Sequence, residues 1–278
     1  MARENALNIY IDNSTKDKLA ETYGNVIEAV QKGAISEQIK NKNYSGDPKS
    51  GSVEIDRFKN ASVDALGTAR TAGNGKALKN TGKVVVNIDT DKEIVEELAM
   101  KDVHLYGIAG MAEKRQTNHV KRMIAFLDNT FFAKAEAEGT SVDLSSHSTV
   151  QEKLEALIQS VEATENDWVD GVDRDQLVVT LRPSVYGALL NYLDSVPNTV
   201  TGLKEDYFHG VRVYSNHRQS KDMICMIDGA IAQPVVTDEY DAEKIPLSNN
   251  IALELFFSVG TKSVMADLIK YSSTGISR

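Results

Sequence analysis

The chain has 278 residues, of which 41% are hydrophobic and 26% charged, and its formal net charge at pH 7 is −9. This composition is typical of one large globular domain or two small ones. The excess of carboxylates argues against a surface built to grip nucleic acid, which needs clustered Lys and Arg. The lone Cys225 cannot form an internal disulfide, and no apolar run is long enough to span a bilayer. We therefore expect a protein of cytosolic origin with no membrane role.

The first 45 residues have the pattern of an arm. Residues 7–11 alternate like a short strand, and Ser14 with Asp17 has the spacing of a helix-capping box. Apolar residues at helical spacing follow: Leu19, Tyr23, Val26, Ile27 and Val30. After Gly33 the sequence becomes polar and rich in Gly, Lys and Asn, which is typical of a linker.

Two alternating segments predict a long β-ribbon. Residues 52–58 place Val53 and Ile55 on one face, and residues 83–89 form a second strand pattern. The intervening residues 59–82 are small and polar. Because a two-stranded ribbon is marginal in water, it needs a surface to rest on. Another subunit would supply that surface if residues 52–89 project from the body. If they form a long surface loop instead, the chain's own body would supply it.

The longest helical pattern covers residues 110–138. Its apolar residues recur at i, i+4, i+7 and i+11: Val120, Ile124, Leu127 and Phe131. At 1.5 Å per residue this helix would be about 40 Å long. Before it, residues 91–99 predict a short helix and residues 103–106 a short strand or turn.

The second half alternates strands with helices. Residues 148–165 predict an amphipathic helix, and residues 173–194 a buried strand that runs into a helix beginning near Pro183. Further strand patterns follow at 211–215, 223–228 and 251–259, and residues 264–269 predict a last apolar strand or helix. The final residues have the character of a loose tail.

No motif predicts a catalytic, cofactor or metal site. Gly75-Lys76 lacks the spacing of a phosphate-binding loop, and the five histidines contain no HxxxH pair. The acidic loop at 170–175 resembles a calcium loop only loosely. Ser184 lies between a strand and a helix, as a catalytic nucleophile can. It follows Pro183, however, so a structural role in the first turn of the helix explains it better than nucleophilic catalysis.

Taken together, the segments resemble the major capsid proteins of tailed bacteriophages, the α+β Johnson fold. The most characteristic sequence segment is LVVTLRPSVYGALL at 177–190, followed by HGVRVYSN at 209–216 and MIDGAIAQP at 226–234. The late IALELFFSVGTKSVMADLIKY resembles the strands that return the chain to the P-domain.

The resemblance implies a division of the chain into five parts. These are an N-terminal arm (1–47), an E-loop hairpin (48–90), a P-domain (91–147) with its spine helix at 110–138, an A-domain (148–245), and a return to the P-domain with a C-terminal tail (246–278). One branch of that family cross-links an E-loop lysine to a neighbouring asparagine. Lys76, Lys79 and Lys83 occupy the corresponding region, but no motif identifies the other partners of that reaction.

The function implied by the resemblance is structural and not enzymatic. Hexamers and pentamers of the chain would form an icosahedral virion capsid around double-stranded DNA, held by non-specific contact, and would assemble in the bacterial host cytoplasm. A separate scaffolding protein is expected, because the chain begins almost directly at the arm, together with a portal. Two alternatives stay open: the shell of an encapsulin-type nanocompartment, and a soluble hydrolase that uses carboxylates near 170–175.

Overall fold

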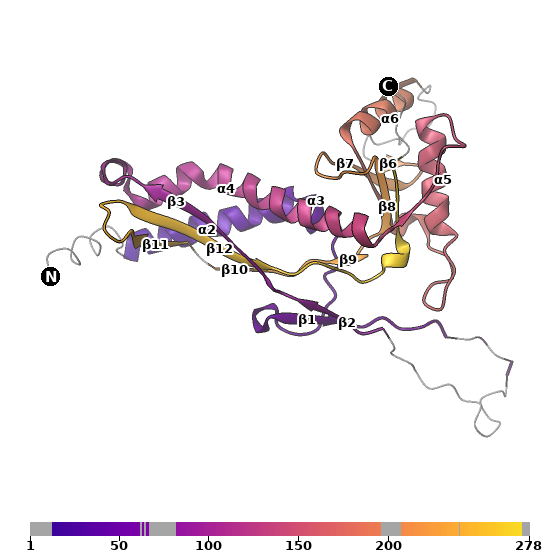
Figure 1. Cartoon of the computed structure of the whole chain (residues 1–278), viewed down its shortest axis with the longest axis horizontal. Coiled ribbons are helices and arrows are strands. Elements are labelled where there is room, and N and C mark those ends of the chain that lie inside the picture. Colours follow the sequence, from indigo (N-terminus) through magenta and orange to yellow (C-terminus); the bar gives the residue numbers. More distant parts are fainter. Residues whose placement is uncertain are drawn as a thin grey trace.

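The computed structural model describes residues 13–61, 63, 65–66, 82–195, 207–238 and 240–273. The molecule has an elongated part, made of long helices and a long sheet, and a globular end built around a second sheet (Figure 1). A narrow β-ribbon projects from the region between them.

Helix α4 (Met100–Glu138) runs the length of the elongated part and into the globular end (Figure 1). Its 39 residues correspond to about 58 Å of helix. The predicted helix at 110–138 is confirmed, but the predicted strand or turn at 103–106 is wrong, because α4 already includes those residues. Gly107 adopts φ 70° and ψ 167° and interrupts the helix there, a conformation that glycine adopts without strain.

The long sheet is organised around β12 (Ile251–Val259). Strand β3 (Thr90–Leu98) pairs antiparallel with it over nine residues, from Thr90 opposite Val259 to Leu98 opposite Ile251. The predicted helix at 91–99 is therefore wrong. Its local spacing fits a helix, but pairing along the whole of β12 outweighs that local preference.

Strands β10 (Val235–Thr237) and β11 (Asp241–Lys244) pair with the other edge of β12. These residues were expected to belong to the A-domain segment at 148–245. In the structure they lie in the long sheet, together with β3 and β12.

Helix α2 (Asn13–Gly33) packs along α4, and α3 (Ile35–Ile39) follows it. Leu19, Val26 and Val30 are buried in one core with Met123 and Leu127 of α4. Residues 13–33 of the segment expected as an N-terminal arm therefore bury their apolar face within the same chain. Residues 1–12, including the strand predicted at 7–11, lie outside the described residues.

The globular end contains a six-stranded sheet in the order β4-β14-β8-β5-β7-β6. Strand β5 is buried throughout and pairs parallel with β7 and antiparallel with β8. The predicted strands and the helix beginning at Pro183 are confirmed. The bounds are β4 Thr140–Ser141, α5 Val150–Glu162, β5 Leu177–Leu181, α6 Pro183–Ser195, β6 Tyr207–Phe208, β7 Val211–Ser215, β8 Met223–Ile227 and β14 Ile269–Ser272.

The last segment divides between the two sheets. Residues 246–278 were expected to return to the P-domain, and β12 does lie in the long sheet. Strand β14, however, pairs with β8 in the globular end, so the return is only partial. Two short strands, β9 (Ile231–Ala232) and β13 (Lys262–Ser263), pair with each other between the two parts. Residues 274–278 lie outside the described residues.

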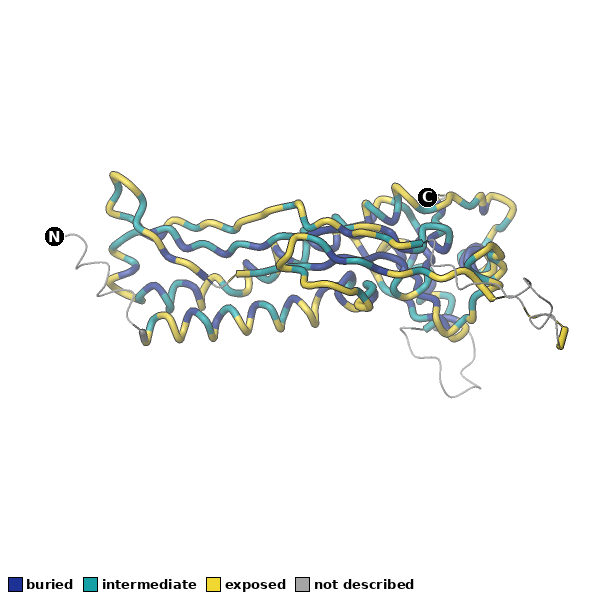
Figure 2. The backbone as a smooth tube through the Cα atoms, turned by 90° about the horizontal axis from the view of Figure 1, so that it is seen from below, coloured by how far each residue is buried: buried dark blue, intermediate teal, exposed yellow. Residues whose placement is uncertain are grey.

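Helix α4 joins the cores of both parts. Its Met123 and Leu127 belong to the core beneath the long sheet, whereas Phe131, Phe132 and Ala135 pack against one face of the six-stranded sheet. Helices α5 and α6 pack in the core on the other face of that sheet. Figure 2 shows the buried residues mainly in the middle of the molecule, where they alternate with partly buried ones along the chain, and exposed residues along its edges. None of the described helices is long and apolar enough to cross a membrane.

Replacing Phe131, which is fully buried, with aspartate should lower the free energy of unfolding by about 4 kcal/mol or more, because a charge without a partner would enter the core. Leu105, 68% exposed on the same helix, gives the matched control Leu105→Asp. Chemical denaturation of both variants checks the prediction. Equal stability of the two variants would contradict the position of Phe131 in the core.

Candidate functional site

The projecting ribbon is formed by β1 (Ser52–Ile55) and β2 (Val84–Asn87), which pair antiparallel with Ser52 opposite Asn87. This confirms the hairpin predicted from the alternating segments. Most of its predicted tip lies outside the described residues, namely 62, 64 and 67–81.

The root of the ribbon rests on the chain's own body. Val53, Ile55 and Val86 are buried in one apolar cluster with Ala232 and Val264. Backbone approach is close here as well. A Cβ on Gly260, just past β12, would lie 2.1 Å from the carbonyl oxygen of Asn87, so only glycine fits. The apolar root therefore fixes where the ribbon begins.

Beyond the root, the outgoing leg of the ribbon is held by polar contacts. Arg57 forms a bidentate ion pair with Asp267, in which both nitrogen–oxygen distances are 2.8 Å. Asn166 donates a 2.6 Å hydrogen bond to the same carboxylate. The guanidinium of Arg57 also lies 5.2 Å from the ring centroid of Trp168, within the range of a cation–π contact.

Further contacts follow within three residues. Lys59 lies 5.4 Å from the Trp168 ring centroid and forms an ion pair with Asp167, and the Asn60 amide donates to the Asp167 carbonyl at 3.0 Å. On the returning leg, a Cβ added to Gly82 would lie 2.8 Å from the Trp168 ring. We name this set the Trp168 clamp; its members are Arg57, Lys59, Asn60, Gly82, Asn166, Asp167, Trp168 and Asp267.

The Trp168 side of the clamp is pre-formed. Asn166 accepts hydrogen bonds from the amides of Trp168 at 2.8 Å and Val169 at 3.0 Å, which closes a tight turn after α5. Burial alone would raise the pKa of Asp267, but Arg57 and Asn166 outweigh it and hold that pKa below its usual range. The carboxylate is therefore charged at neutral pH and available to Arg57.

Past the clamp, two apolar side chains of the ribbon point into solvent. Val63 and Leu66 are 102% and 98% exposed. Sequence patterning left open whether another subunit or the chain itself supports the ribbon. The structure answers this for the root and the clamp, which rest on the chain itself.

The outer face of the long sheet is strongly acidic. Six carboxylates point away from α2 and α4 on β3, β11 and β12, and among the described residues none of the six forms an ion pair. Asp241 lies directly opposite Glu254, an unfavourable like-charge pair. Burial and the neighbouring carboxylates raise the pKa of Glu254 above its usual value. This acidic sheet face comprises Asp91, Glu93, Glu97, Asp241, Glu243 and Glu254.

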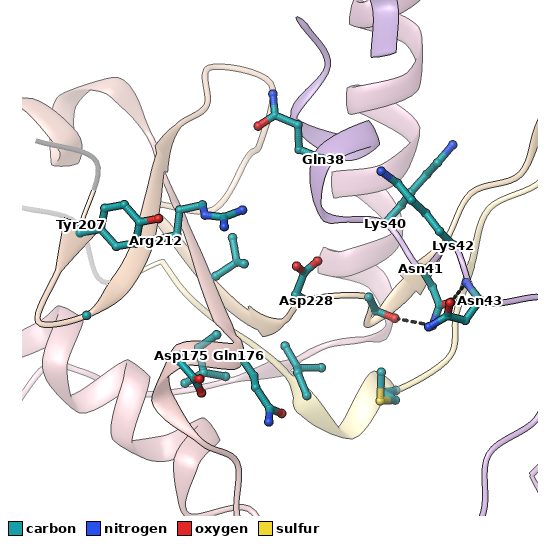
Figure 3. Close-up of a pocket in the computed structure, with 16 residues that line it drawn as sticks. Gln38, Lys40, Asn41, Lys42, Asn43, Asp175, Gln176, Tyr207, Arg212 and Asp228 are labelled. Atoms are coloured by element: carbon teal, nitrogen blue, oxygen red, sulfur yellow. Dashed lines mark hydrogen bonds between the residues drawn. The ribbon is translucent and has the colours of Figure 1, made fainter. Parts of the chain in front are cut away.

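A hollow of about 910 Å³ lies between residues 38–43 and the edge of the six-stranded sheet (Figure 3). The residues that line it carry charges of both signs: Lys42 and Arg212 are basic, and Asp175 and Asp228 are acidic. Lys40 is committed to structure, since its ammonium donates to Glu37 at 2.6 Å and to the Gln233 carbonyl at 3.0 Å. The hollow brings together no nucleophile with a base.

The residues weighed for chemistry remain apart. The acidic loop at 170–175 is solvent-exposed at its three aspartates, and Ser184 is exposed in the first turn of α6. Among the described residues there is no group of three or more His, Cys, Asp or Glu side chains placed to hold a metal ion. Cys225 is fully buried, and burial raises the pKa of its thiol.

Of the lysines considered for cross-linking, only Lys83 lies within the described residues. It forms an ion pair with Glu54, which raises the pKa of its ammonium and favours the protonated, non-nucleophilic form. Lys76 and Lys79 lie outside the described residues.

Two buried polar clusters hold α4 in place. His119 is fully buried; its Nδ1 lies 2.6 Å from the Tyr240 hydroxyl and its Nε2 lies 3.5 Å from Glu96 of β3, a carboxylate that also pairs with Arg115. Burial lowers the pKa of His119, although Glu96 opposes the shift. The second cluster centres on Asp128, buried on α4, which accepts from the Ser36 amide at 3.0 Å and from Arg218 at 2.9 Å.

No family model matches the sequence, and no curated protein matches it. Solved structures do match. A capsid chain of cyanophage P-SCSP1u aligns with a TM-score of 0.63 at 11% identity, over 88% of this chain and 89% of that chain. The chain has the Johnson fold. The crystal structure of a virus-like particle from Pyrococcus furiosus gives 0.59 at 13% identity over 92% and 98%, and a Mycobacterium phage Che8 chain gives 0.57 at 13% over 80% and 84%.

This capsid-protein fold confirms the resemblance that the sequence motifs indicated. The Trp168 clamp, in contrast, was missed. Arg57 and Asp267 are 210 positions apart, and no periodicity relates them. The only local signal was a solitary tryptophan in a polar turn, a residue type that is seldom placed at a surface without a contact to make.

The buried His119 should make stability depend on pH. Its folded-state pKa lies below the unfolded value of about 6.5, so protonation favours unfolding and stability is lost as the pH falls below that value. His119→Gln should flatten the fall in unfolding free energy between about pH 7 and 5. The exposed His217 gives the control His217→Gln, which should behave as the wild type. Identical slopes in all three proteins would show that His119 is not the group responsible.

Proposed function

We propose that this chain is the major capsid protein of a tailed bacteriophage. Many copies, arranged as hexamers and pentamers, would enclose the double-stranded DNA genome in an icosahedral shell. The observation that carries the proposal is the capsid-protein fold, combined with a ribbon that leaves the body and exposes Val63 and Leu66. The role is structural: the activity is self-association and no catalytic step is assigned.

In this proposal each part of the chain has a place in the shell. The ribbon is the E-loop, the elongated part with α4 is the P-domain, and the globular end is the A-domain, which would meet its copies around the symmetry axes. The division follows the cores, so β10 and β11 go with the P-domain and β14 with the A-domain. A separate scaffolding protein and a portal would act during assembly in the host cytoplasm, and the DNA would be held by non-specific contact.

Charge distribution supports a contact between the E-loop and a neighbouring P-domain. Residues 65–88 contain no carboxylate. Their charged side chains are all basic: Arg70, Lys76, Lys79 and Lys83. The acidic sheet face has the opposite sign, and its six carboxylates form no ion pair with the described residues. Because opposite potentials steer and orient association, the basic segment of one subunit is a suitable partner for the acidic sheet face of the next.

A second candidate is a cellular shell of the encapsulin type that encloses proteins in place of a genome. The match to the virus-like particle from Pyrococcus furiosus, over 98% of that chain, favours it. The contents of purified particles distinguish the two candidates: the phage role requires packaged DNA, and the cellular role requires protein cargo.

Replacing residues 67–81 with a short Gly-Ser linker should leave a folded subunit that does not assemble, because both cores and the Trp168 clamp are retained while the outer part of the E-loop is lost. Electron microscopy checks assembly, and circular dichroism with thermal melting checks folding. Intact shells from this variant would count against the role assigned to the E-loop.

Reversing charges on the acidic sheet face should weaken assembly. The double variant Glu93→Lys with Glu254→Lys should lower the yield of shells at low salt, and the further change of Arg70, Lys76 and Lys79 to glutamate should restore it. Glu113→Lys, at an exposed carboxylate on α4, serves as the control and should assemble normally. Light scattering across a salt series provides the measurement. Failure of the compensating changes to restore assembly would argue against this pairing.

A further inference from the structure

The ribbon is attached to the body in two ways that differ in kind. At its root, Val53, Ile55 and Val86 are buried against apolar residues, and such burial is insensitive to salt. At the Trp168 clamp, the contacts are ion pairs, hydrogen bonds and cations over one ring. The side chains of Arg57 and Asp267 are 16% and 29% exposed, and those of Lys59 and Asp167 are 38% and 70% exposed. Salt screens ion pairs that water reaches, so the clamp is the more salt-sensitive of the two attachments.

The clamp lies where a change in direction of the ribbon would begin. It touches the outgoing leg at 57–60 and the returning leg at Gly82, and Val63 and Leu66 beyond it are almost fully exposed. If the clamp opens while the root stays closed, the outer ribbon changes direction without disturbing either core. If the clamp stays closed, the ribbon is held toward the Asn166 turn of its own globular end.

From this arrangement we propose that the Trp168 clamp is a latch. It holds both legs of the ribbon against the body of the free subunit, and it opens when the ribbon moves onto a neighbouring copy during assembly. This inference rests on the proposed function, because it assigns a conformational step to the same E-loop. Local openings of this kind are expected where buried apolar contacts are few and polar contacts are exposed.

Trp168 is the only tryptophan in the chain, so its fluorescence reports on the clamp directly. In dispersed full-length subunits at low salt, the indole should be shielded from acrylamide by Arg57, Lys59 and Gly82. Raising the salt concentration, or assembling the subunits into shells, should shift its emission to the red and increase quenching. Asp267→Asn removes the partner of Arg57 and should give the open signal in dispersed subunits even at low salt.

The control is Glu28→Gln, which removes a different exposed ion pair, that of Glu28 with Lys32 on α2. It should leave Trp168 shielded. Thermal melting of Asp267→Asn close to that of the wild type establishes that the variant is folded. If it melts early, Arg57→Gln tests the same ion pair from the ribbon side.

The outcomes separate the latch from the proposed function. If wild-type shells form and Trp168 is equally or more shielded in them, the latch is wrong while the capsid role stands. If no shells form, the capsid role fails, and the salt response and Asp267→Asn in dispersed subunits still decide whether the clamp opens. An unchanged emission in both of those measurements overturns the latch.

Discussion

The structure depends on a single continuous helix that is buried along two different surfaces. Past its midpoint α4 supplies Met123 and Leu127 to the core beneath the long sheet, and its last turns supply Phe131 and Phe132 to the core of the globular end. Because an α-helix resists bending when no proline or glycine interrupts it, the two cores are held at a fixed separation. The interruption at Gly107 lies before Met123 and Phe131, so the stretch that joins the two cores is unbroken.

Much of the fold follows from local patterns in the sequence. The apolar spacing of 110–138 predicted the central helix, and the alternation at 251–259 predicted the central strand of the long sheet, because each pattern is long and belongs to an element with one buried face. The partner strand β3 was predicted as a helix. Its inward residues Ile94, Glu96 and Leu98 include a charge, which obscures the period of two, and its pairing with residues some 160 positions later has no local signature.

The sites that relate distant segments were harder to predict. Asp128 lies off the predicted apolar stripe of Ile124, Leu127 and Phe131, where a solvent-exposed carboxylate is the ordinary expectation, yet it is fully buried. Its partners, Ser36 and Arg218, come from segments 92 residues before and 90 residues after it. The Trp168 clamp is similar, since Arg57 and Asp267 on its two sides are 210 positions apart. Sequence patterns indicate which apolar residues share one face of an element, but not which polar residues contact each other in the fold.

Asp128 also has a mechanical consequence. Burial raises the pKa of this carboxyl, while the Ser36 amide and Arg218 oppose that rise, so the group is costly to leave without either donor. The two donors belong to α3, whose Ile39 packs in the core against the six-stranded sheet, and to the loop between β7 and β8 of the globular end. Any rotation of α4 against the globular end would pull a donor away from a carboxylate that water does not reach. Helix α4 is thereby locked to the globular end, and the geometric adjustments that a curved assembly demands are left to the outlying segments.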